Sequence, residues 1–329
     1  MKRIKVVLAR CVLVWVCVLS GGHGAALAQA EGSDGFEVVE GDSNGGQDDA
    51  SWQKPVPFDG LYQRIAKDLK DGKPLVVASY YGMWFKNADD PENNLNWGMR
   101  YGHATLMRKS RTHKHVRKNY RHRNWQLVFE ESQGSEPLRT LVFKHSGVKP
   151  NRKWKALGVT EPFDAYIVMQ AFEEQKRAGI KMVENLRQDR GRTLTLDDGT
   201  VLDVGSAQVV GYFGHNFFYD FFGFGWDGLS KISGTPSRPK GLFAVGCRTG
   251  RVPGFPALIG RNVHAVLYSR SLMASEGYST LALLDGLLRA HNSKQMANLA
   301  NDTYQYFQRL PNPDRRVGRP FISHDHGLY

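Results

Sequence analysis

The spacing of apolar positions along the chain predicts four helices. In Gly60–Lys70 an apolar residue recurs at every fourth position, which makes one apolar helical face. Tyr278–Ala290 and Ser293–Gln308 show the same amphipathic pattern and follow one another near the end of the chain. Pro162 favours the start of a fourth helix, which we expect to run from Phe163 to about Arg190.

Short apolar runs between these helices predict buried strands. The runs lie at 75–81, 125–131, 139–145, 208–214, 241–246 and 262–269. The second and third flank Gln133-Gly134-Ser135 and are expected to form a hairpin, whereas residues 82–104, rich in Gly, Asn and Trp, are expected to form a loop. Strands that alternate with helices predict an α/β fold, a three-layer sandwich in which helices cover both faces of a mostly parallel sheet.

The first thirty residues have the pattern of an export signal. Basic residues precede the short apolar run Cys11–Ser20, and Ala28-Gln29-Ala30 has the small residues of a cleavage site. We therefore expect residues 1–30 to be a signal peptide and the protein to be exported, periplasmic or secreted; an N-terminal anchor is the alternative. No stretch after the signal is apolar for long enough to predict a transmembrane segment.

Composition divides the remainder of the chain into three parts. Residues 31–50 carry seven acidic residues and no basic ones, so we expect a disordered segment. Residues 51–310 are expected to form one α/β domain, followed by an irregular, Pro- and Arg-rich tail at 311–329. The chain has 329 residues, of which 41% are hydrophobic, enough for one large core or two small ones.

Removal of the signal leaves a single cysteine. Of the three cysteines, Cys11 and Cys17 leave with the signal, and Cys247 remains without a partner for an internal disulfide. A lone thiol in an oxidising compartment is exposed to oxidation or to pairing with another molecule unless it is buried or has a functional role.

Candidate chemistry lies directly after two of the predicted strands. His215 follows 208–214 and Cys247 follows 241–246. Ligands of parallel α/β sheets bind outside the carboxyl ends of the strands, so neighbouring strands would place both side chains in one crevice. In a pair of this kind the thiolate is the nucleophile and the imidazole is the general acid/base. The alternative interpretation is a core cysteine beside a core histidine.

The backbone around these two residues is suited to support such chemistry. Gly214 and Gly246 precede the two side chains and allow a substrate to approach the main chain closely. The N–H groups of Asn216 and Cys247 are candidate donors to an oxyanion.

The segments VVGYFGHN and LFAVGCRTG together resemble the paired motifs of caspase-like (clan CD) cysteine peptidases. The resemblance implies the caspase–haemoglobinase fold over 51–310, with His215 as general acid/base, Cys247 as nucleophile, a peptide or protein substrate and no cofactor. Asn216 stands where the family has Gly after His, Gly246 stands where a small residue is usual, and the His–Cys spacing is shorter than in caspases. The region 262–288 also resembles exported bacterial proteins of unknown function, which implies no activity.

Two carboxylates near the motifs are candidate pocket residues. Asp220 lies five positions after His215 and is placed to orient the imidazole or line the cleft, although a surface or capping role is the simpler interpretation. Glu276 precedes a predicted helix, where a carboxylate interacting with the helix dipole is the simpler interpretation.

A basic segment, Arg108–Arg123, contains eight Lys and Arg residues and three histidines. Such a run predicts polyanion binding through counterion release, and the acidic stretch 31–50 is one candidate partner. Tyr120 is the one aromatic residue in it, which argues against a platform for stacking bases. A solvated insertion is the alternative. None of the His positions in the chain has the spacing of a closed zinc site, so no metal is predicted.

Three functions fit the sequence. The preferred interpretation is an exported caspase-like cysteine hydrolase, an endopeptidase acting through His215 and Cys247. The alternatives are a non-catalytic binding or scaffold protein on the same fold, and a surface protein that binds polyanions through its basic segment.

Overall fold

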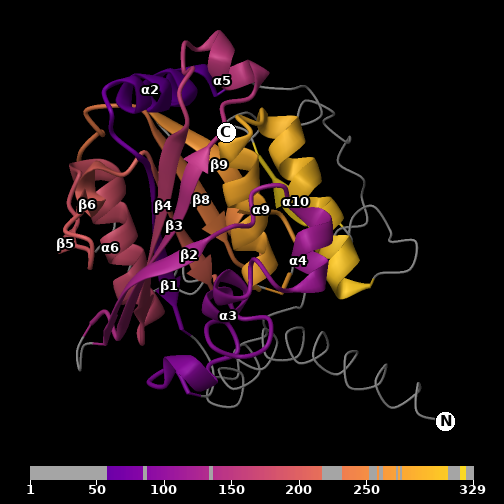
Figure 1. The fold of residues 1–329 in the computed structure, drawn as a ribbon. Helices are drawn as coiled ribbons and strands as arrows, with labels where there is room; N and C mark the ends of the chain where they lie inside the picture. Colours follow the sequence, from indigo (N-terminus) through magenta and orange to yellow (C-terminus); the bar gives the residue numbers. More distant parts are fainter. Residues whose placement is uncertain are drawn as a thin grey trace.

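The computed structural model describes residues 58–83, 87–132, 136–216, 232–251, 258, 262–271, 273–274, 276–309 and 319–323. Within these ranges the chain builds a mixed sheet of eight strands with helices on both faces (Figure 1). The predicted signal peptide and acidic segment both lie outside the described residues.

The sheet has the strand order β10-β9-β8-β7-β1-β4-β3-β2. Its parallel centre consists of β4 (Phe163–Phe172), β1 (Leu75–Gly82), β7 (Val209–Gly214), β8 (Lys240–Val245) and β9 (Val263–Ser269). Antiparallel strands extend both sides, namely β3 (Arg139–Val148) with β2 (Gln126–Ser132), and β10 (Phe321–Ile322). The α/β class with a mostly parallel sheet is confirmed, and so is the predicted hairpin of β2 and β3.

Helices cover the two faces unequally. One face carries α2 (Asp59–Lys70), α3 (His103–Arg108), α4 (Lys114–Asn119), α5 (Arg152–Ala156), α9 (Gly277–Leu288) and α10 (Ser293–Gln308). The other carries α6 (Gln175–Gln188) and the small hairpin of β5 (Thr193–Thr195) and β6 (Val201–Asp203). Figure 1 shows α6 on one side of the sheet and α9 with α10 on the other. No helix in the described part of the chain has the length and apolar character needed to cross a membrane.

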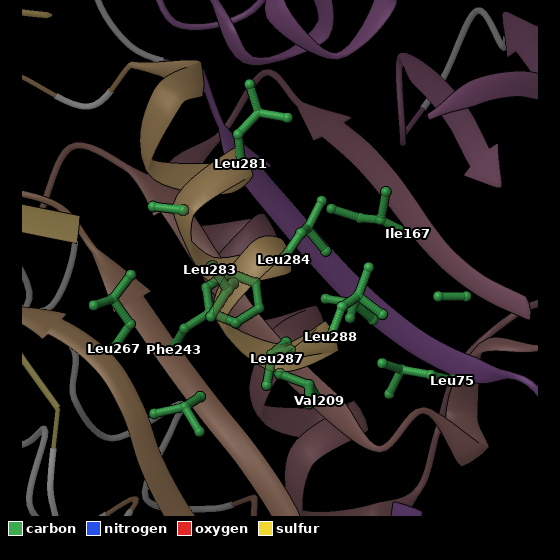
Figure 2. Packing of buried hydrophobic residues seen from close by; sticks show 14 of the residues in the cluster. Leu75, Ile167, Val209, Phe243, Leu267, Leu281, Leu283, Leu284, Leu287 and Leu288 are labelled. Carbon is green, nitrogen blue, oxygen red and sulfur yellow. The ribbon is translucent and has the colours of Figure 1, made fainter. Parts of the chain in front are cut away.

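Helix α9 forms the centre of the larger core. All of its residues are buried, because the sheet lies on one side of it and α10 and α3 pack around the others. Leu284 and Leu287 share one buried cluster with Ile167, Val209 and Phe243 of the strands (Figure 2). A helix that is apolar on every side is stable only when enclosed in this way.

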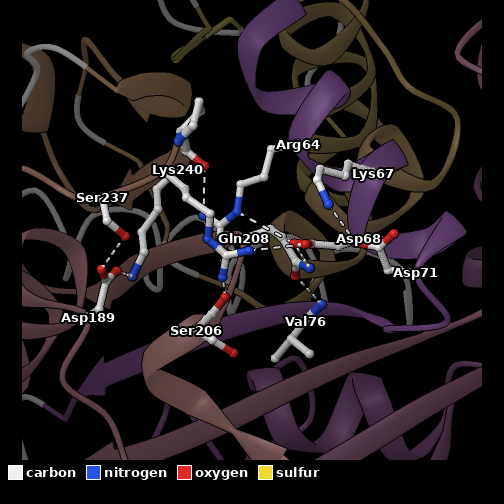
Figure 3. A network of polar contacts seen from close by, with 12 residues as sticks. Arg64, Lys67, Asp68, Asp71, Val76, Asp189, Ser206, Gln208, Ser237 and Lys240 are labelled. Carbon is white, nitrogen blue, oxygen red and sulfur yellow. Dashed lines mark hydrogen bonds and ion pairs between the residues drawn. The ribbon is translucent and has the colours of Figure 1, made fainter.

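A polar network ties the starts of β7 and β8 to the helices around them (Figure 3). Lys240 is fully buried, and its Nζ donates to the carbonyl oxygens of Asn185 and Gly205 at 2.7 and 2.9 Å and to Oδ1 of Asn185 at 3.0 Å. The same Nζ pairs with Asp189 at 2.7 Å. Burial lowers the pKa of Lys240 to about 8, although Asp189 acts in the opposite direction.

The single helix predicted from Phe163 is wrong. The structure has β4 over Phe163–Phe172 and only then α6 over Gln175–Gln188. β4 is rich in apolar and aromatic residues and lies between β1 and β3, buried on both faces, so pairing and burial outweigh the helix-start signals near Pro162.

The tail contributes a strand that the sequence did not predict. β10 pairs with the end of β9, and Phe321 and Ile322 are buried. The side chain of Asn301 in α10 fixes this segment, since it donates to the carbonyl of Phe321 and accepts from its N–H, both at 2.9 Å. Residues 310–318 and 324–329 of the predicted irregular tail lie outside the described residues.

Buried histidines predict a loss of stability in acid. Burial lowers the pKa of His122 and of His291 to about 4, and it also lowers the pKa of His145. In the unfolded chain histidines titrate near ~6.5, so between about pH 6.5 and 4 the unfolded state binds more protons. We expect the urea midpoint to fall as the pH is lowered from 7 to 5, and to fall less in a His291→Gln variant. An unchanged midpoint at pH 5 would show that these histidines titrate normally.

Candidate active site

The candidate site lies at the carboxyl edge of the sheet, the edge at which β4, β1, β7, β8 and β9 end. After β1 the chain forms β2, β3 and β4, all on one side of β1. It then crosses to the other side of β1 and forms β7 there. The strand order therefore reverses between β1 and β7, and a reversal of this kind leaves a crevice in which α/β sheets bind ligands.

Glycines allow main-chain segments to approach one another closely along this edge. Gly82 and Gly214 are paired at the ends of β1 and β7. Gly214 has a φ of 150°, and a Cβ there would lie 2.5 Å from the carbonyl oxygen of Gly82. A Cβ on Gly246 would lie 2.6 Å from the carbonyl oxygen of Gly214. These contacts leave no room for a side chain at Gly214 or Gly246, so both positions require glycine.

His215 and Cys247 follow two neighbouring parallel strands, as the sequence analysis required. β7 pairs with β8 through Phe213 and Val245, each of which stands two residues before a candidate side chain. Both residues therefore leave the sheet at the same level of the carboxyl edge, and both are half-buried.

Asn216 joins the two segments. It is buried, and its Nδ2 donates to the carbonyl oxygen of Cys247 at 2.5 Å. The carbonyl of His215 accepts a hydrogen bond from the Tyr212 hydroxyl at 2.8 Å. Asn216 thus holds the segment after β7 against the segment after β8.

The Cys247 thiol lies against the segment that follows β9. Its Sγ donates to the carbonyl oxygen of Met273 at 3.3 Å and accepts from the Met273 N–H at 3.5 Å. Burial raises the pKa of this thiol, while the Met273 N–H and the charge of Arg248 act in the opposite direction with smaller effect. The thiol is therefore protonated at neutral pH, and a nucleophilic role requires a base.

Hydroxyl groups hold the turn that carries Cys247. Ser269 at the end of β9 donates to the carbonyl of Gly246, and the hydroxyl of Thr249 donates to the carbonyl of Ala244 at 2.7 Å. The N–H of Thr249 in turn donates to the Ser269 hydroxyl at 3.3 Å. Sequence reasoning missed Ser269, Thr249 and Met273, although a hydroxyl residue that ends an apolar strand was a visible signal for the first.

Of the two proposed pocket carboxylates, the structure describes Glu276 alone. Glu276 is the residue before α9, and its Oε2 accepts from Nε2 of Gln308 at 3.1 Å, which makes it part of the α9–α10 packing. Asp220 lies outside the described residues.

His103 lies in the core beside the carboxyl edge. It is fully buried, its Nδ1 lies 2.6 Å from the hydroxyl of Thr280, and its ring packs on Tyr81 and Phe213. Among the described residues no group of three His, Cys, Asp or Glu side chains is arranged to hold a metal ion.

Comparisons with models of known families, with curated proteins and with solved structures find no match to this chain.

Proposed function

We propose that this protein is an exported cysteine hydrolase of the caspase-like type, an endopeptidase with Cys247 as nucleophile and His215 as general acid/base. The observation that carries the proposal is the position of both residues directly after neighbouring parallel strands, beside the reversal of strand order. Nucleophile and base from separate segments meet in this way at the ligand-binding edge of α/β sheets.

In the proposed reaction, Sγ of Cys247 attacks the carbonyl carbon of a peptide bond while its proton passes to the imidazole of His215. The carbonyl oxygen becomes an oxyanion, for which the N–H groups of Cys247 and Asn216 are the proposed donors. The imidazolium returns the proton to the amine as the C–N bond breaks, which leaves a thioester. Water, deprotonated by His215, then releases the acid and restores the thiol.

Because the pKa of the thiol is raised, His215 is needed to accept its proton. A thiol that burial holds protonated is a poor nucleophile by itself, so attack depends on transfer of the proton to the base. The fixed turn around Cys247, held by Ser269 and Thr249, keeps the sulfur in place during that transfer.

One observation favours a non-catalytic role on the same architecture. Within the described residues Cys247 Sγ makes its two hydrogen bonds with Met273, which is how a structural thiol is satisfied inside a protein. A scaffold protein would retain these contacts and lack turnover.

Replacement of the base tests the proposal. We expect His215→Ala to lower kcat/KM for peptide cleavage by about 10²–10⁴, because a positioned general base contributes on that order. Cleavage of a peptide library, read by mass spectrometry, is the measurement. His264→Ala is the matched control, since His264 is half-buried at the start of β9, at the opposite end of the sheet. Equal cleavage by both variants and the unaltered protein would contradict the role of His215.

A further inference from the structure

The segment around α4 presents cations that no described carboxylate neutralises. We call them the cationic face: Lys109, Arg111, Lys114, Arg117, Lys118 and Arg121. All six are exposed, and within the described residues none of them forms an ion pair. Arg108, at the border of the face, is different, because it pairs with Glu92 at 3.3 Å and with Glu130 at 2.6 Å.

The cationic face is anchored to the core. Val116 and Tyr120 are buried, and the Tyr120 hydroxyl donates to the carbonyl of Tyr278 in α9 at 2.7 Å. On the α10 side, Nδ1 of His115 lies 2.6 Å from the Tyr306 hydroxyl. The main chain of α4 is therefore fixed beside α10, away from α2 and α5 (Figure 1).

The positive charges of this region repel one another. The pKa of His113 is lowered first by burial and then by the nearby charges of His115, Arg100, Lys109 and Lys114. A bound polyanion would remove this repulsion and release its own counterions, which favours binding.

The aromatic rings beside the face are already engaged. Phe307 stacks on Tyr278, with ring centroids 4.8 Å apart, and on His113 at 6.2 Å, while Nζ of Lys118 lies 5.3 Å from the centre of the Tyr306 ring. These rings offer no open platform for nucleic-acid bases. The large apolar side chains exposed among the described residues, Met99, Leu127 and Val201, do not belong to the face, so it has nothing to insert into a membrane.

We propose that the cationic face binds an anionic polysaccharide, a chain of sugar rings that carry sulfate, phosphate or carboxylate groups. Such a partner needs a cluster of exposed cations and neither stacking rings nor apolar anchors. The proposal is independent of the hydrolase, since the face contains no residue of the carboxyl edge.

Binding to heparin, a sulfated polysaccharide, tests this with the full chain. We expect log K to fall with log salt concentration with a slope of about −4 when six charges are engaged. Replacing Lys114, Arg117 and Lys118 by Gln should weaken binding at least tenfold and reduce the slope by about 2. The matched control replaces Lys73, Lys149 and Lys155 by Gln, three exposed cations outside the face, and should bind as the unaltered protein does.

Four outcomes would overturn the proposal. Equal weakening by the two triple variants would show that only net charge matters. Tighter binding of single-stranded DNA than of heparin, compared at equal charge and salt, would make the partner a nucleic acid. Tighter binding of phosphatidylglycerol vesicles would make it a membrane surface. Tighter binding of a peptide of residues 31–50 would make it the chain's own acidic segment.

Discussion

Cys247→Ala is expected to abolish peptide cleavage and to leave the fold nearly intact. In an enzyme whose nucleophile is a hydroxyl paired with an imidazole, loss of the nucleophile lowers kcat by a factor of about 10⁶. We expect a decrease of that order for the thiol of Cys247. The side chain is half-buried and only its sulfur is removed, so the free energy of unfolding should fall by about 1 kcal/mol. Library cleavage and urea unfolding of the same preparation measure both effects.

A structural cysteine would give the reverse order of effects. Cys247→Ala would then lower stability by up to about 3 kcal/mol, because the Met273 N–H and carbonyl lose their partner, while any cleavage activity persisted in the folded fraction. Cys247→Ser is the control, because the hydroxyl is nearly the same size and can bond to Met273 in place of the thiol. Unchanged cleavage by folded Cys247→Ala protein would contradict the mechanism, whatever the fold.

Among the substitutions considered, Lys240→Met is expected to lower the free energy of unfolding most. The substitution keeps the length of the side chain and removes the donor shared by the buried carbonyls of Asn185 and Gly205. Asp189, with 37% of its side chain exposed, retains access to water, so the cost arises mainly from the carbonyl groups. A buried acceptor left without its donor costs about 1–3 kcal/mol, so we expect the loss of both bonds to cost about 2–6 kcal/mol.

The urea midpoint, compared at equal m-value, measures this loss. Lys155→Met is the matched control, because Lys155 is an exposed lysine of α5 and its replacement should change stability by less than about 0.5 kcal/mol. A Lys240→Met protein as stable as this control would show that the network in Figure 3 contributes nothing to folding.

The apolar pattern predicted most of the elements because burial determines them. β1, β7, β8 and β9 lie within a residue or two of the predicted runs, and α10 spans exactly the expected residues. β4 was missed because a strand buried on both faces lacks the alternation that marks a half-buried one, and Pro162 suggested a helix start. β10 was missed because two residues have no pattern; the side chain of Asn301, twenty positions away, holds them in place.

The candidate site was predictable in part. Strand–Gly–His and strand–Gly–Cys indicate residues at strand ends, and the adjacency of β7 and β8 brings those ends together. Met273 could not be predicted as the contact of the thiol, since it follows β9 in an irregular segment with no sequence signal. Equally, the rings of α10 beside the basic segment lie nearly two hundred positions away from it along the chain.

Covalent trapping of Cys247 in the folded protein at neutral pH tests most directly whether this thiol is a nucleophile. A panel of peptidyl acyloxymethyl ketones, varied in the residue before the ketone, offers the thiol a carbonyl to attack and a leaving group to displace. Digestion and mass spectrometry then locate the adduct. We expect a thioether at Cys247 that forms in the native protein and is lost in His215→Ala. A native protein that leaves Cys247 unlabelled by every member of the panel, while iodoacetamide labels the same thiol after unfolding, would contradict this role of Cys247.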